Sequence, residues 1–212
     1  MEKKVMGIKV RDYVYFLSAI VFASLLNAFV LRPNLYQPSI DYIIDLQTRG
    51  RDPYLLIFFN TIRKLGSTWF IYGTLLLIYV FKERALAFHY TLVVSFMMFF
   101  LVFMKMLIRF PRPYQYSPEV IPTTCSGQYG CPSATTIRVT TLLASLFFDF
   151  VHERRHKMGV VKYTLMLCLN VFCIGSVMVS RVYLAAHSIN QVIFGGSIGF
   201  SISVFLYFSV KP

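Results

Sequence analysis

Charged residues are scarce in this sequence. They make up 14% of its 212 residues, and only nine residues are aspartate or glutamate. Hydrophobic residues account for 57% and the mean hydropathy is +0.62. This balance excludes an ordinary soluble globular domain and indicates an integral, polytopic membrane protein. No carboxylates cluster with the spacing of metal ligands, so we expect neither a metal site nor a cofactor.

Other features are also missing. The basic start MEKKVMGIKVR leads into an apolar run that is too long for a signal peptide and has no small-residue cleavage site, so this segment is expected to be retained. There is no internal repeat and no low-complexity tract, so residues 1–212 are expected to form a single membrane domain. The net charge of +12 would suggest nucleic acid in a soluble chain. Here the basic residues gather at the ends of apolar runs, which favours membrane lipid as the partner and excludes nucleic acid.

Six windows of about 20 apolar residues predict transmembrane helices. They lie at residues 12–31, 67–81, 87–108, 134–150, 162–180 and 188–208. We therefore expect an all-α bundle of six transmembrane helices, with both termini on the same side. Residues 33–66 read as an excursion along the membrane interface. The distribution of lysine and arginine favours a cytoplasmic location for the terminal side. In the last span, Gly195 and Gly199 present a small face suited to close helix packing.

Three polar clusters interrupt this apolar pattern. The stretch KMLIRFPRP places Lys105, Arg109 and Arg112 at intervals of four and three, which aligns them along one stripe of a helix. Basic residues also end many spans by reaching to the interface, which is the simpler interpretation of this cluster alone. The stretch GCPSATT offers Pro132 and Ser133 as a helix start, with the proline in the first turn and the serine hydroxyl as a cap. Such a start is either an ordinary cap or an anion site.

The third cluster is SRVYLAAHSINQV, which carries Arg181 and His187 between two apolar runs. A lone histidine in a membrane protein is more often a packed residue than a catalyst. The predicted topology, however, brings all three clusters to one membrane face, where uncompensated cations would repel one another and so imply a bound anion. A phosphate suits them best: Arg112 and Arg181 would grip its oxygens, with Lys105 as a point charge. The imidazole of His187 could then attack phosphorus.

These residues resemble the three signatures of the type-2 phosphatidic acid phosphatase superfamily: K-x6-R-P from Lys105, P-S at Ser133, and S-R-x5-H ending at His187. The sequences RVYLAAH and IRFPRP look most like the glucose-6-phosphatase and sphingosine-phosphate phosphatase branches. The resemblance implies a phosphate held by four residues and attacked by a histidine nucleophile. The phosphate-binding residues would be Lys105, Arg112, Ser133 and Arg181, with Arg181 and the nucleophile His187 in the catalytic set.

Two positions depart from the family pattern. The second signature normally carries a histidine that protonates the departing alcohol, and this catalytic position is Thr135 here, so the signature is degenerate. Most members have an aspartate that orients the nucleophile where this chain has Gln191, although the glucose-6-phosphatase branch also carries glutamine. A threonine hydroxyl is too weak an acid to replace the histidine, whose contribution would be about 10² to 10⁴-fold in rate.

Two functions follow from this pattern. One is a metal-independent phosphoric monoester hydrolase that acts on a lipid phosphate or sugar phosphate through a phosphohistidine, weakened at Thr135. The alternative is a catalytically inactive descendant, a structural or lipid-binding subunit with protein partners in a membrane complex. We expect residence in the endoplasmic reticulum or plasma membrane, with the active face lumenal or extracellular. On such a face Cys125 and Cys131 would form a disulfide, whereas in a reducing compartment they would stay free thiols.

Overall fold

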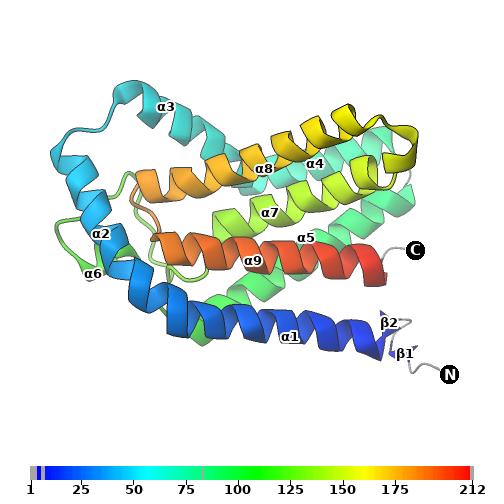
Figure 1. Ribbon diagram of the computed structural model, residues 1–212, viewed down its shortest axis with the longest axis horizontal. Helices are drawn as coiled ribbons and strands as arrows, with labels where there is room; N and C mark the ends of the chain where they lie inside the picture. The colour runs from blue at the N-terminus through cyan, green and yellow to red at the C-terminus, as the bar shows by residue number, and fades with distance from the viewer. Residues whose placement is uncertain (1–3, 6–7, 83, 211–212) are drawn as a thin grey trace.

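Helices dominate the architecture (Figure 1), whose computed structural model describes residues 4–5, 8–82 and 84–210. Two strands of two residues each pair in antiparallel fashion ahead of the first helix. The elements, in chain order, are β1 (Lys4–Val5), β2 (Ile8–Lys9), α1 (Val10–Leu26), η1 (Asn27–Leu31), α2 (Arg32–Thr48), α3 (Pro53–Ile62), η2 (Arg63–Gly66), α4 (Thr68–Phe81), α5 (Arg84–Ile108), α6 (Pro113–Tyr116), α7 (Ala134–Phe147), η3 (Phe148–His152), η4 (Arg155–Lys157), α8 (Val160–Tyr183), α9 (Ile189–Phe205) and η5 (Leu206–Val210).

Five described helical stretches are long and apolar enough to cross a membrane. They are Val10–Thr48, Arg84–Tyr116, Ala134–His152, Val160–Tyr183 and Ile189–Ser209. A further pair, Pro53–Gly66 and Thr68–Phe81, is bent by 51° and brings the number to six if it counts as one span. The polytopic helical fold expected from hydropathy is confirmed. The first expected span belongs to a longer helical stretch, and the second follows a helix that hydropathy did not separate from the polar segment.

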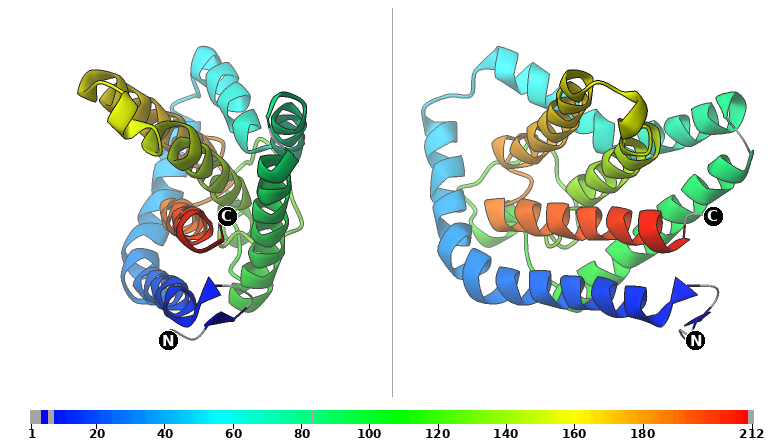
Figure 2. Two further views of the ribbon diagram at one scale, coloured as in Figure 1. Left: turned by 90° about the vertical axis from the view of Figure 1, so that its right-hand side faces the viewer. Right: turned by 45° about the vertical axis from the view of Figure 1, so that its right-hand side comes forward.

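Helix α2 lies across one end of the bundle, at a steep angle to α1 and α9 (Figures 1 and 2). One turn of π-helix, η1, lies between α1 and α2. The buried side of α2 carries Tyr36, Ile40 and Ile43, which pack in one apolar cluster with Val182 and Val192 from α8 and α9. Helix α2 therefore covers the ends of α8 and α9, while the expected course of residues 33–66 along the membrane interface stays a prediction.

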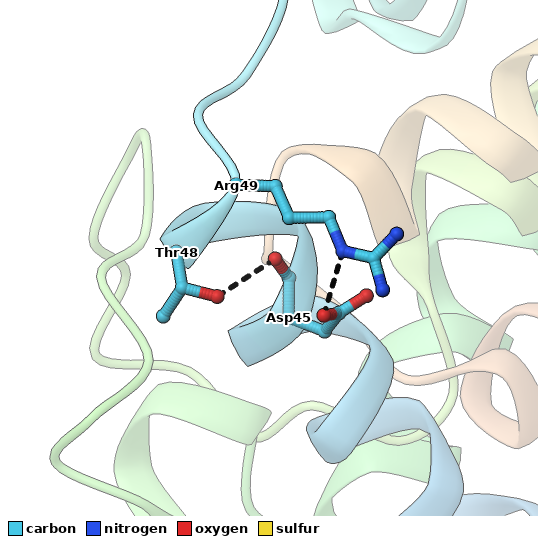
Figure 3. Close-up of polar contacts among 3 residues, drawn as sticks. All are labelled: Asp45, Thr48 and Arg49. Atoms are coloured by element: carbon cyan, nitrogen blue, oxygen red, sulfur yellow. Dashed lines mark hydrogen bonds and ion pairs between the residues drawn. The ribbon is translucent and has the colours of Figure 1, made fainter.

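The C-terminal end of α2 is held by local polar contacts (Figure 3). Thr48 Oγ1 donates to the carbonyl of Asp45 at 2.9 Å, and Arg49 Nε lies 2.8 Å from a carboxylate oxygen of Asp45. One residue earlier in the chain, Gln47 exchanges two hydrogen bonds with the backbone of Ile121, at 2.8 and 3.0 Å. This end of α2 therefore anchors the long loop that precedes α7.

The bend between α3 and α4 has clear local causes. Asp52 caps α3 by accepting from the amides of Tyr54 and Leu55, while Pro53 occupies the first turn. The 3₁₀ turn η2 then ends the helix, and Ser67 starts α4 by accepting from the amide of Phe70 at 3.2 Å. This turn packs against α7 and α8.

Helices α7 and α9 form the closest helix pair of the core. A Cβ atom added to Gly199 would lie 2.8 Å from the carbonyl oxygen of Ile137, and one added to Gly195 would lie 3.0 Å from that of Ser133. The expected small face of α9 is confirmed, since any side chain there would push the two helices apart. At the end of the bundle remote from α2, β2 contacts η5. Helix α1 therefore begins at the same end of the bundle at which η5 ends (Figure 1).

Candidate active site

The three polar clusters meet at the end of the bundle that α2 covers (Figure 1). They come from the end of α5 with the turn after it, the start of α7, and the link between α8 and α9. The side chains expected to bind phosphate or to attack it are all buried there, at 0–7% exposure: Lys105, Arg112, Ser133, Arg181 and His187. Arg109, by contrast, is exposed, and its Nε donates to the carbonyl of Met106 at 2.8 Å, so it lies outside this group.

His187 is held by two opposite contacts. Its Nδ1 lies 3.2 Å from Gln191 Oε1, and Gln191 Nε2 donates to the carbonyl of Pro111 at 2.7 Å. Because the amide nitrogen of Gln191 is occupied as a donor, its oxygen faces the imidazole and accepts a proton from Nδ1. The lone pair is then on Nε2, which lies 3.4 Å from Arg112 Nη1. Gln191 therefore orients the imidazole in the tautomer that a nucleophile needs.

The electrostatic setting keeps this imidazole neutral. Burial, and then the positive charges of Arg181, Arg112 and Lys105, lower the pKa of His187 well below its ordinary value. The hydrogen bond with Gln191 acts in the opposite direction but is the smallest of these effects. A neutral imidazole whose Nε2 carries no proton is the form that attacks phosphorus.

Lys105, Arg112 and Arg181 form what we call the cationic clamp. Arg112 donates from Nε to the carbonyl of Gln128 at 2.9 Å and from Nη1 to that of Ala186 at 3.2 Å. Lys105 Nζ donates to the side chain of the same Gln128 at 3.1 Å. Gln128 thus bridges two cations, and sequence reasoning missed it because the loop Tyr114–Tyr129 carries no recognisable pattern.

Arg181 joins the clamp from the end of α8. Its carbonyl accepts from the amides of Ala186 and His187 at 3.0 and 3.2 Å, which fixes the return of the chain toward the nucleophile. Its side chain is 7% exposed, and Nε is buried without a hydrogen-bond partner in the described part of the chain. A buried guanidinium donor of this kind is normally satisfied by an anion.

The start of α7 differs in detail from the expectation. Ser133 occupies the N-cap position, but its hydroxyl makes no capping hydrogen bond and instead accepts from Thr136 Oγ1 at 2.9 Å. Pro132 precedes the cap rather than lying in the first turn. The expected serine cap is therefore wrong, because Thr136 takes up the hydroxyl. Ser133 N donates to the carbonyl of Gln191 at 3.2 Å, which ties the start of α7 to α9 beside the nucleophile.

Thr135 occupies the second position of α7 and is half-buried. A Cβ atom added to Gly66 of η2 would lie 2.5 Å from Thr135 Cγ2 and 2.7 Å from the carbonyl oxygen of Thr135, so the turn η2 packs closely against the start of α7. One turn further along α7, Arg138 donates to Thr68 Oγ1 at 2.9 Å. The segment between α3 and α4 therefore borders the site, a neighbour that the sequence pattern did not indicate because residues 33–66 were assigned to the interface.

A second set of polar residues supports the α8–α9 link from behind. Ser188 Oγ donates to Asn190 Oδ1 at 2.7 Å, and Asn190 Nδ2 donates to Asn27 Oδ1 at 3.3 Å. Asn27 lies in the π-helical turn η1, and its Nδ2 is 3.8 Å from the sulfur of Cys131. These contacts connect the first helix to both segments that flank the nucleophile. In the sequence, Asn27 is a single polar residue within an apolar run, and this was the signal that could have indicated these contacts.

The two loop cysteines are free thiols in this structure, so the bridge between them stays a prediction. Cys125 is exposed, whereas Cys131 is 1% exposed and burial raises the pKa of its thiol to about 12. Within the described residues, no group of three histidine, cysteine or acidic side chains is placed to hold a metal ion.

Comparison with known proteins shows which structures the chain is similar to. No curated protein matches the sequence. Two solved structures share the fold. The first is described as the first transmembrane PAP2 type phosphatidylglycerolphosphate phosphatase, from Bacillus subtilis; it has a TM-score of 0.67 and 18% identity over 93% of this chain and 92% of that one. The second is LpxE from Aquifex aeolicus, with a TM-score of 0.61 and 19% identity over 81% of this chain and 93% of that one.

The family assignment comes from the sequence itself. The model of the PAP2 superfamily matches residues 84–211, which include all three signatures. This confirms the resemblance at the level of the superfamily, while the branch nearest to glucose-6-phosphatase stays a prediction. The chain therefore belongs to the PAP2 superfamily.

Proposed function

We propose that this chain is a membrane phosphatase that hydrolyses a phosphate monoester through a phosphohistidine at His187. The observation that carries the proposal is the buried, neutral imidazole, with Nδ1 bonded to Gln191 and Nε2 facing Arg112 at 3.4 Å. The structural neighbours, one described as a phosphatidylglycerolphosphate phosphatase, support a lipid phosphate as the substrate class. We also propose that residues 1–212 form one membrane domain whose active face is lumenal or extracellular, in the endoplasmic reticulum or plasma membrane.

The chemistry follows from the contacts. The cationic clamp binds the phosphoryl oxygens and stabilises the charge that develops on them, as donors in a site shielded from water do effectively. Nε2 of His187 forms a bond to phosphorus while the bond to the ester oxygen breaks and its electron pair leaves with that oxygen, and Gln191 Oε1 accepts a hydrogen bond from Nδ1–H of the resulting imidazolium. Water then attacks phosphorus, the P–N bond breaks with its electron pair returning to Nε2, and the proton that the water loses leaves with inorganic phosphate or solvent.

Thr135 limits the first step. An alkyl alcohol leaves as an unstable alkoxide unless it gains a proton, and a threonine hydroxyl does not supply one. Positioned acid catalysis is worth about 10² to 10⁴-fold in rate. We therefore expect 4-nitrophenyl phosphate, whose leaving group needs no proton, to be cleaved faster than hexyl phosphate by a factor on that scale.

The test uses the purified chain with both substrates and acid-quenched trapping of a phosphoenzyme. A phosphoenzyme that is lost in His187→Ala supports the proposal, as does the preference for nitrophenyl phosphate. Thr135→His should raise the rate on hexyl phosphate more than the rate on nitrophenyl phosphate. The imidazole must turn away from Gly66, whose backbone contacts Thr135. Absence of a phosphoenzyme at saturating substrate contradicts the proposal.

The degenerate second signature favours one alternative, an inactive descendant that binds a lipid headgroup as a structural subunit with protein partners. It predicts that the wild type binds inorganic phosphate or anionic lipid without hydrolysing either substrate. Stable co-purification with other membrane proteins, together with no detectable hydrolysis of either substrate, would support this alternative over the enzyme. Hydrolysis above that of His187→Ala excludes it.

A further inference from the structure

A groove lies between α1 and α9 toward the end of the bundle at which α1 begins and η5 ends (Figure 1). We call this end the terminal end. The groove has a volume of about 590 Å³, and from Arg11 to Ala19 it follows α1 for about 12 Å, at 1.5 Å per residue. None of the residues that line it belongs to the cationic clamp. The groove is therefore separate from the candidate active site, which lies at the opposite end.

Aromatic side chains form the floor of the groove. Phe16 of α1 and Phe205 of α9 are both buried, and their rings stack with the centroids 4.6 Å apart. Phe200 and Phe208 are exposed and form the wall on the side of α9 and η5. On the side of α1, the small side chain of Ala19 leaves the part nearer the middle of the bundle open. A concave apolar channel between two membrane helices has the shape and polarity to hold a hydrocarbon chain.

The other part of the groove, at the terminal end, is polar and basic. Lys9 and Arg11 line it, together with Tyr15 and Ser209, whose hydroxyls can donate hydrogen bonds. Asp12 is the single carboxylate among the described lining residues and lies 3.7 Å from Arg11 Nε, while the side chain of Arg11 remains 54% exposed. An exposed ion pair of this length is weak. Two cations against one carboxylate leave this part of the groove with a net positive charge.

The position of these cations matches the level of lipid headgroups. The apolar stretch that can cross the membrane starts at Val10, directly between Lys9 and Arg11. Basic side chains at such a boundary attract anionic lipids. A zwitterionic headgroup would bring a quaternary ammonium or ammonium group against the two cations, whereas an anionic phospholipid brings negative charge alone. The groove therefore complements an anionic phospholipid in both charge and polarity.

We propose that this groove binds an anionic phospholipid from the membrane leaflet at the terminal end. Lys9 and Arg11 bind the lipid phosphate, and one acyl chain lies along Ala19 and over the rings of Phe16 and Phe205. The bound lipid joins α1 to α9 and so stabilises the packing of these two helices. It is not a substrate, because the candidate active site lies at the other end of the bundle. The inference does not depend on the proposed phosphatase function.

The charge of the headgroup is tested by native mass spectrometry of the purified chain in detergent. Dioleoyl phosphatidylglycerol should bind more tightly than dioleoyl phosphatidylcholine, which has the same chains. The double variant Lys9→Gln/Arg11→Gln should lower this preference by roughly 10 to 30-fold, the scale expected for two cations beside an anionic lipid. Arg154→Gln/Lys162→Gln is the control, since it removes two exposed cations outside the groove and should keep the preference. Equal affinity of the wild type for both lipids, or an unchanged preference in Lys9→Gln/Arg11→Gln, overturns the proposal.

The apolar part of the groove is tested with Ala19→Trp, whose indole fills the space beside Phe16 and leaves both cations in place. In the wild type, phosphatidylglycerol at 100 times its dissociation constant should raise the melting temperature by about 5–10 °C. Ala19→Trp should lose this increase, and Ser18→Trp, which is exposed on the same turn but outside the groove, should keep it.

Two results of this second experiment would contradict the proposal. An increase that Ala19→Trp retains would show that the lipid binds through surface charge alone. A dimer that excludes lipid from the groove would show that a second copy of the chain occupies it. Both experiments measure binding and stability, so their outcome is the same whether or not the chain hydrolyses a phosphate ester.

Discussion

At the scale of single residues, the neutral state of His187 makes stability depend on pH. The folded state lowers the pKa of this imidazole well below its ordinary value of about 6.5. Below about pH 6.5 the unfolded chain therefore binds a proton that the folded chain does not, so folding stability falls as the pH falls. Between pH 7.5 and pH 5, the melting temperature of His187→Asn should fall by less than that of the wild type. The other three histidines are common to both proteins, so equal losses would contradict this burial effect.

Gln191 positions the nucleophile through a second residue-scale effect. Its amide bridges the carbonyl of Pro111 and Nδ1 of His187, at 2.7 and 3.2 Å. Gln191→Leu removes the acceptor that the imidazolium needs during attack, a hydrogen bond to a charged group worth about 1.5–3 kcal/mol. We expect kcat for 4-nitrophenyl phosphate to fall by roughly 10 to 150-fold with a smaller change in KM. Gln37→Leu, at an exposed position on α2, is the matched control, and comparable losses in both variants would refute the positioning role.

At the scale of elements, the close approach of α7 and α9 depends on glycine. A side chain at Gly199 meets the carbonyl of Ile137, with the added Cβ only 2.8 Å away. Gly199→Val should therefore separate the helices and destabilise the protein by about 1–3 kcal/mol. Gly175→Val in α8 is the control, because an added Cβ there meets nothing within 4 Å. Thermal unfolding in detergent measures both, and similar melting temperatures would contradict tight packing of the α7–α9 pair.

The same scale explains what the sequence could and could not predict. The long apolar helices could be predicted from hydropathy. The helix ends that carry Lys105, Arg112 and His187 could be predicted as a site from residue spacing, because a charge beside an apolar run is costly and so indicates a function. The contact of the turn η2 with Thr135 could not be predicted, since it depends on a bend between two helices. Gln128 was equally hidden, because its contacts with two clamp cations arise from the path of a loop.

At the scale of the whole molecule, the site and the short turn η4 lie at opposite ends of the bundle (Figure 1). Cys125 is exposed on the loop at the site end, whereas Cys131 is buried and its thiol has a pKa of about 12. Only a thiolate reacts readily with a maleimide. In sealed vesicles, a membrane-impermeant maleimide should therefore label Cys125 from the site face only, and Cys131 only after denaturation.

A cysteine placed at the other end provides the reference for this labelling. His156→Cys lies in η4, which is exposed, and should react from the face opposite to that of Cys125. Orientation with the site outside the cytoplasm predicts that intact cells label Cys125 and leave His156→Cys unlabelled. If the site face is oxidising and the disulfide forms, Cys125 reacts only after reduction, while the sidedness is unchanged. Labelling of both positions from one face would refute the arrangement, because the bundle would then not place its two ends on opposite sides of the membrane.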